Sequence, residues 1–391
     1  MTDRLEAPWM QRADLADLVA ALGAGNARYV GGAVRDTLLG LPVKDIDMAT
    51  LLLPEEVIAR LDAAGIRNVP TGIEHGTVTA VLPGGPVEIT TLRHDVSTDG
   101  RRATVAFATE WRDDAARRDF TINALYADPQ SGEIFDWFGG RDDLSQRCVR
   151  FIGDARERIR EDHLRILRYF RFQARFGSQP ADQEAESAIT ELAATLKGLS
   201  RERVGMETMN LLGLADPGPT VRRMSELGVL AVILPEADPD ALATLVAVEQ
   251  SQEIAPDALR RLAALLPALV PLAEQVASRF RLSGAQKKRL ATAAGRDGAA
   301  GYARSLAYRL GPECGLDRLL LAGADTAPLA GWEVPAFPLK GGQIVARGVG
   351  AGPEVARTLR RVEDRWIAEG FPDEARVFAI LDEELASGSP Q

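Results

Sequence analysis

Histidine and cysteine are scarce in this chain, which excludes several kinds of metal and redox site. Among 391 residues there are three histidines and two cysteines. Cys148 and Cys314 lie far apart in the sequence, so we do not expect a disulfide framework. Two isolated cysteines fit a protein of the reducing cytosol. Three histidines cannot build a histidine-rich metal centre, and no spacing of Cys and His is typical of a zinc site.

A long hydrophobic run and a surplus of positive charge are also missing. The most apolar stretch, residues 262–276, is interrupted by Pro267 and Pro271 and is too short to span a membrane. The first ten residues carry acids where a secretory signal would have an apolar run. The net charge of −10 argues against nonspecific nucleic-acid binding over the whole surface. These features predict a cytoplasmic globular protein with two or more domains.

Positive charge is nevertheless concentrated in one segment. Residues 141–176 contain ten arginines and six acids, whereas the whole chain has 46 basic and 56 acidic residues. A local basic track of this kind can attract a polyanion even when the net charge is negative.

The spacing of apolar residues changes from mixed to helical along the chain. The first ~140 residues combine strand-like runs rich in Val, Ile and Thr with helical stretches, and the later residues are helical throughout. We therefore predict an α+β fold with a mixed sheet in the head and an all-helical remainder. The expected strands are 28–30, 46–49, 77–82, 87–92, 104–107 and 134–137. The expected helices are 13–22, 33–39, 54–63, 119–127, 164–176, 185–196, 221–227, 259–265 and 355–366.

Two acids, Asp45 and Asp47, closely follow a glycine pair, Gly31-Gly32, and Arg35. Residues two apart on a strand point to the same face, so the two carboxylates would stand side by side. Carboxylates at that separation repel each other unless a cation joins them, and hard oxygen ligands suit Mg²⁺. Glycines let backbone N–H groups approach a phosphate, and Arg35 adds a charged donor. The combination predicts a metal-dependent nucleotidyl-transfer site.

Parts of this pattern have ordinary explanations when taken alone. An Asp-x-Asp pair is common at strand ends and turns. A dinucleotide-binding loop would need a third spaced glycine after Gly31-Gly32 and a lone acid ~20 residues later, and both are missing. A Walker-type phosphate loop is excluded because no Gly-Lys-Ser/Thr follows. Glu88, on an expected strand, is a candidate third catalytic acid beside Asp45 and Asp47.

Arg117-Arg118-Asp119 forms a second cluster, which has two interpretations. Asp119 can cap a helix that begins there and leave the arginines in solvent. Alternatively, the arginines and the acid can clamp a triphosphate and a ribose hydroxyl.

A third cluster comprises Asp162, Arg165, Arg168 and Arg171, which recur every three residues. The simple interpretation is an ion pair at a helix start, worth a few tenths of a kcal/mol. A carboxylate beside a guanidinium also offers an acceptor next to a donor. Cytosine and adenine present an amino donor next to a bare ring nitrogen, whereas uracil and guanine present the reverse. Asp162 and Arg165 could thus select C and A without a nucleic-acid template, with roughly 1–3 kcal/mol of discrimination for a good bidentate pair.

Together these motifs resemble those of the class II tRNA nucleotidyltransferases, which are the CCA-adding enzymes, and of the related bacterial poly(A) polymerases. GGAVRD, DID, RRDFTINAL and REDHLRILRYFRF stand in that family's order and approximate spacing over most of residues 28–177. The later residues resemble the family's helical body and tail more loosely. The resemblance implies a polymerase-β-like nucleotidyltransferase head (1–142), a base-reading helical neck (143–205), a helical body (206–275) and a tRNA-contacting helical tail (276–391).

The resemblance also implies roles for individual residues. Asp45 and Asp47 would hold the magnesium ions. Asp162 and Arg165 would read the base, while Arg118 would contact phosphate. The full set of nucleotide-binding residues that the resemblance implies is Gly32, Arg35, Arg118, Asp119, Asp162, Arg165, Arg168 and Arg171.

The expected reaction is attack of a tRNA 3′-hydroxyl on the α-phosphate of CTP or ATP. The polar segment 90–103 is either an exposed hairpin or a mobile loop over the active site. By the resemblance, the loop around 93–102 matches the place of the flexible element with which family members switch from C to A. A bacterial poly(A) polymerase that uses only ATP is the main alternative, although the chain lacks a C-terminal run of Lys and Arg. A non-catalytic RNA-binding relative is a weaker alternative.

The tail is not conspicuously basic, and 287–289, 340–342 and 348–352 are the candidates for contact with the tRNA elbow.

Overall fold

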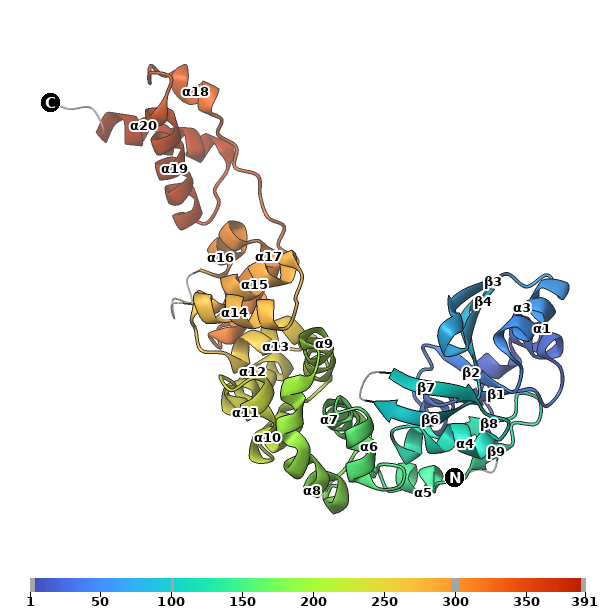
Figure 1. Cartoon of the computed structure of the whole chain (residues 1–391). Helices are drawn as coiled ribbons and strands as arrows, with labels where there is room; N and C mark the ends of the chain where they lie inside the picture. Colours follow the sequence, from blue (N-terminus) through green and yellow to red (C-terminus); the bar gives the residue numbers. More distant parts are fainter. Residues whose placement is uncertain (1–3, 100–101, 297–301, 388–391) are drawn as a thin grey trace. The chain divides into compact units, whose positions relative to one another are not determined.

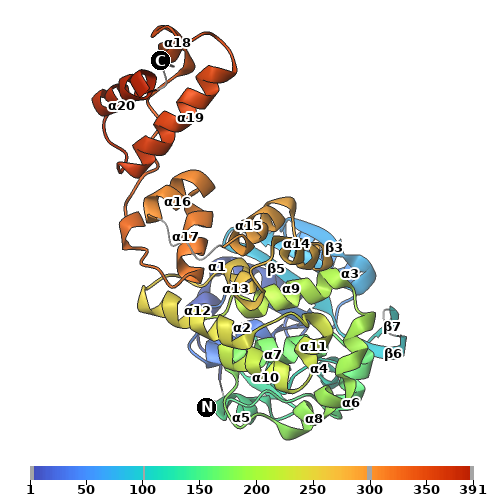
Figure 2. The same ribbon diagram turned by 90° about the vertical axis from the view of Figure 1, so that its left-hand side faces the viewer.

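The computed structural model describes residues 4–99, 102–296 and 302–387 of a chain that divides into two compact units (Figures 1 and 2). The first unit is Met1–Pro235 and the second is Glu236–Gln391. All strands of the described residues lie in the first unit, before residue 137, and helices follow them. This confirms the predicted α+β head followed by a helical remainder. No helix among the described residues is long and apolar enough to cross a membrane.

The elements have the following bounds. The strands are β1 (Ala27–Val30), β2 (Ile46–Thr50), β3 (Asn68–Gly72), β4 (Thr77–Leu82), β5 (Gly85–Thr91), β6 (Arg93–Asp99), β7 (Arg102–Phe107), β8 (Leu125–Ala127) and β9 (Ile134–Asp136). The helices of the first unit are α1 (Ala13–Leu22), α2 (Gly32–Leu38), α3 (Pro54–Ala63), α4 (Trp111–Ala116), α5 (Gly140–Ser145), α6 (Ala155–Glu161), α7 (Arg165–Phe176), α8 (Gln183–Leu192), α9 (Arg201–Leu212), α10 (Gly218–Glu226) and α11 (Val229–Ile233). Those of the second unit are α12 (Pro239–Ser251), α13 (Ala258–Leu265), α14 (Val270–Arg279), α15 (Gly284–Ala294), α16 (Ala303–Leu310), α17 (Pro312–Leu321), α18 (Gly341–Val345), α19 (Pro353–Ala368) and α20 (Glu374–Ser387). Short 3₁₀ turns are η1 (Pro8–Gln11), η2 (Ile73–His75), η3 (Thr121–Asn123), η4 (Ala193–Gly198) and η5 (Ala327–Leu329).

A seven-stranded mixed sheet with the order β3-β4-β5-β2-β1-β8-β9 forms the centre of the head. Strands β2 and β5 pair in parallel, and the other neighbours are antiparallel. The parallel register places Asp47 directly beside Glu88. Because paired residues of neighbouring strands point to the same face, the two acids share one face of the sheet. The topology therefore joins two acids that are far apart in sequence.

Most of the predicted elements of the head are present. Helices α1 and α3 have the predicted bounds, and β4 does as well. Strands β6 and β7 pair as an antiparallel ladder, which agrees with the hairpin interpretation of the polar segment, while the interpretation as a mobile loop over the active site stays a prediction. Residues 100–101, part of the 93–102 segment expected to hold the flexible element, lie outside the described residues. Strands β3, β6 and β8 were not predicted.

The predicted helix over 119–127 is wrong. The structure has the 3₁₀ turn η3 there, followed by strand β8. Strand β8 is completely buried between β1 and β9, with which it pairs. The sheet therefore overrides a local pattern that is compatible with a helix, because burial and ladder hydrogen bonds outweigh weak propensities.

Helix α7 joins the head to the helical part of the first unit through an aromatic cluster. Phe120 of the head stacks near Phe151 and Phe172, with ring centroids 5.0 and 5.1 Å apart, and Tyr169 adds a fourth ring. Phe120, Tyr169 and Phe172 are buried, while Arg168 and Arg171 are partly exposed, with their guanidinium carbons 5.6 and 4.8 Å from the centre of the Phe172 ring. The cluster fixes the polar side of α7 relative to the head, because tightly packed aromatic rings tolerate little displacement.

The second unit contains a network of buried charges. Glu249 on α12 accepts hydrogen bonds from the Nε atoms of Arg260 and Arg261 on α13, at 2.7 and 2.8 Å. Asp317 on α17 accepts from Arg289 on α15 at 2.6 Å and lies 3.4 Å from Arg260. Glu249, Arg260, Arg261 and Asp317 are at most 3% exposed. The network joins four helices through buried ion pairs, which are stronger than exposed ones because the protein interior has a low dielectric constant. Helices α18 to α20 pack around a core of their own that includes Trp366.

Replacing Glu249 by glutamine is expected to destabilise the second unit strongly. The change leaves Arg260 and Arg261 buried without their carboxylate, and breaking a buried ion pair costs about 3–5 kcal/mol. Urea unfolding followed by circular dichroism measures the loss. The matched change Glu354→Gln, in the exposed pair with Arg357, should leave the unfolding midpoint nearly unchanged, because water screens that pair. Equal losses for both variants would contradict the role assigned to the network.

Candidate active site

A pocket of about 530 Å³ opens in the first unit and is lined by the central sheet, the β1–α2 turn, the segment after α4, and helices α7 and α9. All of its lining residues lie between positions 30 and 203. The pocket includes these predicted site residues: Gly32, Arg35, Asp47, Glu88, Arg118, Asp119, Asp162, Arg165 and Arg168. Of the other predicted residues, Asp45 and Arg171 are not part of its lining.

Asp47 and Glu88 form an acidic pair on the floor of this pocket. They are partners in the parallel ladder between β2 and β5, and within the described part of the chain neither carboxylate makes an ion pair. Burial raises the pKa of Asp47 above its usual value, and the negative charges of Glu88 and Asp45 raise it further. Arg118 opposes this shift, so its guanidinium lies within electrostatic reach of Asp47. Asp45 itself is exposed and precedes the first residue of β2.

The acidic pair has the chemistry of a cation-binding site. Asp47 is half-buried and Glu88 is exposed. Like charges held close together favour a bound cation, and carboxylate oxygens suit a hard divalent one. No group of three or more His, Cys, Asp or Glu residues in the described ranges is arranged to hold a metal by itself.

The turn between β1 and α2 brings backbone and a guanidinium to the same pocket. Gly31 adopts φ +62°, and a Cβ atom there would lie 3.2 Å from Arg118 Nη1. Arg35, one turn further along α2, is buried and donates to Asn123 Oδ1 at 2.5 Å and to Asp36 at 2.8 Å. Burial lowers the pKa of Arg35, although Asp36 opposes this effect. The predicted phosphate-binding elements thus meet at one wall of the pocket.

Replacing Gly31 by alanine is expected to weaken CTP binding and to destabilise the protein by about 1–3 kcal/mol. Alanine is strained at this φ value, and its methyl group would press against Arg118. Gly40→Ala is the matched control, because Gly40 has φ +67° but no atom within 4 Å of the added methyl group. Both variants should lose stability in thermal unfolding, and only Gly31→Ala should lose CTP affinity in calorimetry. Normal affinity in Gly31→Ala would rule out close approach of phosphate to this turn.

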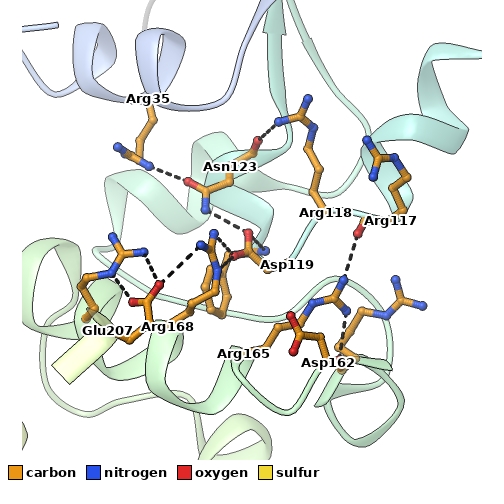
Figure 3. Close-up of polar contacts among 12 residues, drawn as sticks. Arg35, Arg117, Arg118, Asp119, Asn123, Asp162, Arg165, Arg168 and Glu207 are labelled. Carbon is orange, nitrogen blue, oxygen red and sulfur yellow. Dashed lines mark hydrogen bonds and ion pairs between the residues drawn. The ribbon is translucent and has the colours of Figure 1, made fainter. Parts of the chain in front are cut away.

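Arg118 is held in the pocket wall by three partners, of which Figure 3 shows Asn123. Its Nε donates to Tyr126 Oη at 2.9 Å, its Nη1 to the carbonyl of Asn123 at 3.4 Å, and its Nη2 lies 3.3 Å from Asp114 Oδ2. Burial opposes its charge, but Tyr126 and Asp114 outweigh that effect and raise the pKa of Arg118. The side chain therefore remains a fixed cation next to the acidic pair.

Asp119 and Arg168 form an ion pair across the pocket. Arg168 Nε donates to Asp119 Oδ2 at 2.8 Å, and Asn123 donates to Oδ1 at 3.0 Å. Burial opposes ionisation of Asp119, but Arg168 and Asn123 outweigh it and hold the pKa of this carboxyl below its usual value. Arg171 points elsewhere and donates to buried Glu207 at 2.6 Å, while Glu207 also lies 3.9 Å from Arg168. Arg171 therefore does not line the pocket but contacts it indirectly, through Glu207 and through the ring of pocket-lining Phe172, whose centre lies 4.8 Å from its guanidinium carbon.

Asp162 and Arg165 both line the pocket, but they do not pair with each other (Figure 3). Asp162 Oδ2 accepts from Arg203 at 2.7 Å. Arg165 donates to Glu161 at 2.5 Å and to the carbonyls of Arg158 and Arg117 at 2.9 and 3.3 Å. The simple interpretation of an ion pair between the two residues is therefore wrong. The acceptor and the donor are held by separate partners.

Several residues of the site were not singled out from the sequence. Asp114, Asn123, Arg203 and Glu207 each contact a predicted residue, and the first three line the pocket. Asn123 lies within the RRDFTINAL motif, and Arg203 and Glu207 lie within LSRERVGMET. The sequence did contain a signal for Asp114. It lies four residues before Arg118, and side chains at this spacing are neighbours on a helix, so an ion pair between the two could have been predicted.

Comparison with known proteins identifies the family. Residues 27–150 match the family described as the poly A polymerase head domain, and residues 182–240 match the one described as the probable RNA and SrmB- binding site of polymerase A. The mitochondrial CCA tRNA nucleotidyltransferase 1 of Danio rerio is 35% identical over 358 residues, which cover 87% of this chain and 83% of that protein. The chain belongs to the class II CCA-adding enzyme and poly(A) polymerase family.

Other members of this family are similar over different lengths. The CCA-adding enzyme of Geobacillus stearothermophilus is 39% identical over 210 residues, which are 53% of this chain and 50% of that protein. The solved structure of the Bacillus stearothermophilus CCA-adding enzyme in complex with CTP matches with a TM-score of 0.79 and 27% identity, over 98% of this chain and 99% of that one. Members of this nucleotidyltransferase family generally use a divalent metal. The acidic pair fits such an ion.

Proposed function

We propose that this chain is a CCA tRNA nucleotidyltransferase, which adds C, C and A to the 3′ end of tRNA from CTP and ATP without a nucleic-acid template. The 3′-hydroxyl of the tRNA attacks the α-phosphate of the nucleotide, and pyrophosphate leaves. The observation that carries the proposal is one pocket that combines an acidic pair, a wall of fixed arginines and a separated acceptor and donor. The relatives named as CCA-adding enzymes support the same reaction.

The proposed metal is Mg²⁺, held in the pocket by Asp47 with Glu88 beside it. Asp45, the other predicted ligand, is exposed and does not line the pocket, so its part in holding the metal remains a prediction. When bound, Mg²⁺ would lower the pKa of the attacking hydroxyl and neutralise charge on the leaving pyrophosphate. The protein's own part is to position the reactants. Arg118 and the Gly31-Gly32 turn bind the triphosphate where the fixed donors cost no reorganisation during the reaction.

Asp162 and Arg165 are proposed to read the base. A carboxylate has about four acceptor positions, so Asp162 can still accept from an amino group while Arg203 holds its Oδ2. Arg165 uses its Nη atoms on Glu161, Arg158 and Arg117, which leaves the Nε hydrogen and one Nη hydrogen for a bare ring nitrogen. The pair therefore presents the pattern that cytosine and adenine complement and that uracil and guanine oppose.

The remaining parts of the proposal concern the rest of the chain. The head, neck, body and tail boundaries at 142, 205 and 275 remain a prediction, as does the cytoplasmic location; the relative from Danio rerio is named as mitochondrial. Of the candidates for contact with the tRNA elbow, Lys287 and Lys288 line an open pocket of about 440 Å³. Arg289 is engaged with Asp317 and is not proposed as a contact.

Extension of a tRNA that lacks its last three nucleotides tests the function. CTP alone should add two residues, and subsequent ATP should add one A and then stop. A tRNA that already ends in CCA is the control and should not be extended. Long A tracts without CTP would support a poly(A) polymerase instead. Retention of tRNA on a filter without any Mg²⁺-dependent extension would support a non-catalytic RNA-binding protein.

A further inference from the structure

The carboxylate of Asp114 is buried at the edge of the pocket and receives four donors. It is 1% exposed. Oδ1 accepts from Arg117 Nε at 2.9 Å and from the backbone N–H of Arg93 at 3.2 Å. Oδ2 accepts from the hydroxyl of Tyr126 at 2.5 Å and lies 3.3 Å from Arg118 Nη2. A carboxylate has about four acceptor positions, so Asp114 is fully occupied by the protein.

These contacts include a directed relay from Asp114 through Tyr126 to Arg118. A carboxylate can only accept and a guanidinium can only donate, so the Tyr126 hydroxyl must donate to Asp114 and accept from Arg118. Tyr126 is itself fully buried. The relay therefore fixes both the position and the rotation of the Arg118 guanidinium.

The charge of Asp114 also keeps two adjacent cations in one place. Arg117 and Arg118 both form ion pairs with it, and without it they would face each other across the same wall. Burial opposes ionisation of Asp114, but Arg118 and Arg117 hold the pKa of this carboxyl below its usual range. Asp114 is thus a charged anchor at neutral pH, and it cannot at the same time bind a metal or a substrate.

We propose that Asp114, acting through Tyr126, is a positioning residue that aims the Arg118 guanidinium at the triphosphate. This inference rests on the proposed function, because it takes Arg118 as a contact of the incoming nucleotide. Fixed donors contribute most when they need no reorganisation, and a displacement of about 1 Å can cost about 100-fold in rate. The relay keeps Arg118 ready next to Gly31 and Asp47 before the nucleotide arrives.

The test measures CTP affinity by calorimetry, and kcat and KM for CTP in tRNA extension, in Asp114→Asn. The amide retains one acceptor but loses the charge, and we expect CTP affinity to fall by about tenfold, within the range usual for residues of one network. Asp113→Asn is the matched control, because Asp113 lies on the same helix and is exposed. Its affinity and rate should equal those of the wild type. Tyr126→Phe breaks the relay without changing charge and should lower the affinity in the same direction, even if Asp114→Asn fails to fold.

A double-variant cycle with Arg118→Gln separates positioning from general structural damage. If Asp114 acts through Arg118, Asp114→Asn should change CTP affinity by less than about threefold once Arg118 is absent. A tenfold loss in both backgrounds would overturn the proposal, as would wild-type affinity in Tyr126→Phe. The binding cycle does not require turnover. If the wild type binds CTP but extends no tRNA, the proposed function fails while the relay is still tested.

Discussion

Asp47→Asn is expected to reduce nucleotide incorporation into tRNA by at least about a thousandfold. Asp47 is the one predicted metal-binding acid that lines the pocket, and it lies beside Glu88, with neither carboxylate in an ion pair among the described residues. Stabilisation of developing charge by a metal is worth several kcal/mol, and each 1.4 kcal/mol corresponds to about tenfold in rate. Asp45→Asn is expected to lose incorporation as well. Single-turnover extension with CTP measures both.

The same substitution should stabilise the folded protein when no divalent cation is present. The pKa of Asp47 is raised in the folded state, so the folded protein favours the protonated carboxyl. Protonated Asp47 therefore contributes to the stability of the fold at pH values below the pKa that this residue has in the unfolded chain. That contribution is lost as pH rises through the raised pKa, and ionised Asp47 then destabilises the fold. In chelator at neutral pH, Asp47→Asn should therefore melt at a higher temperature than the wild type, and the difference should disappear in acid. Asp17→Asn, an exposed acid on α1, should change neither activity nor melting. Near wild-type incorporation by Asp47→Asn would show that the assignment is wrong.

Reversal of the base-reading pair, Asp162→Arg with Arg165→Asp, is expected to change which nucleotides are used. The donor and acceptor would exchange places, so C and A should be used less and U or G should be admitted. A good bidentate pair supplies roughly 1–3 kcal/mol, which corresponds to about 5- to 150-fold in relative kcat/KM. Extension with each of the four nucleotides separately measures the preference.

The structure indicates that this reversal also needs changes in the partners. Arginine at position 162 would face Arg203, and aspartate at position 165 would face Glu161. Like charges at these distances oppose the intended geometry. The full test therefore adds Arg203→Gln and Glu161→Gln, with those two changes alone as the control. Reversal of the exposed pair Glu354 and Arg357 controls for the change of charge pattern. An unchanged preference in the four-residue variant would remove Asp162 and Arg165 from the reading of the base.

The sequence predicted the elements whose signals are local and missed those that depend on partners. Pro54 and the acids after it mark the start of α3, and its bounds were predicted correctly. Strand β8 was taken for a helix because its short apolar segment gives no periodicity of its own. Its identity comes from pairing with β1 and β9, which the chain meets only after folding.

The site shows the same division between local and distant information. Asp47 could be predicted because a short motif carries it, and Glu88 was proposed because it lies on a recognisable strand. The parallel pairing of β2 and β5, which puts the two acids side by side, has no local signal. Arg171 repeats the spacing of Arg165 and Arg168, yet it turns toward Glu207, a residue of another helix. Periodicity gives the face of a helix, but it does not say what lies opposite.

Binding of Mn²⁺ in the presence of CTP tests the central claim most directly, because paramagnetic resonance detects free Mn²⁺ without any need for turnover. With the wild-type protein, the signal of free Mn²⁺ should decrease well beyond the decrease caused by CTP alone. With Asp47→Asn, it should remain at the level of CTP alone, while Asp17→Asn behaves as the wild type. Equal binding of Mn²⁺ and CTP by the wild type and Asp47→Asn would contradict a cation held by these acids.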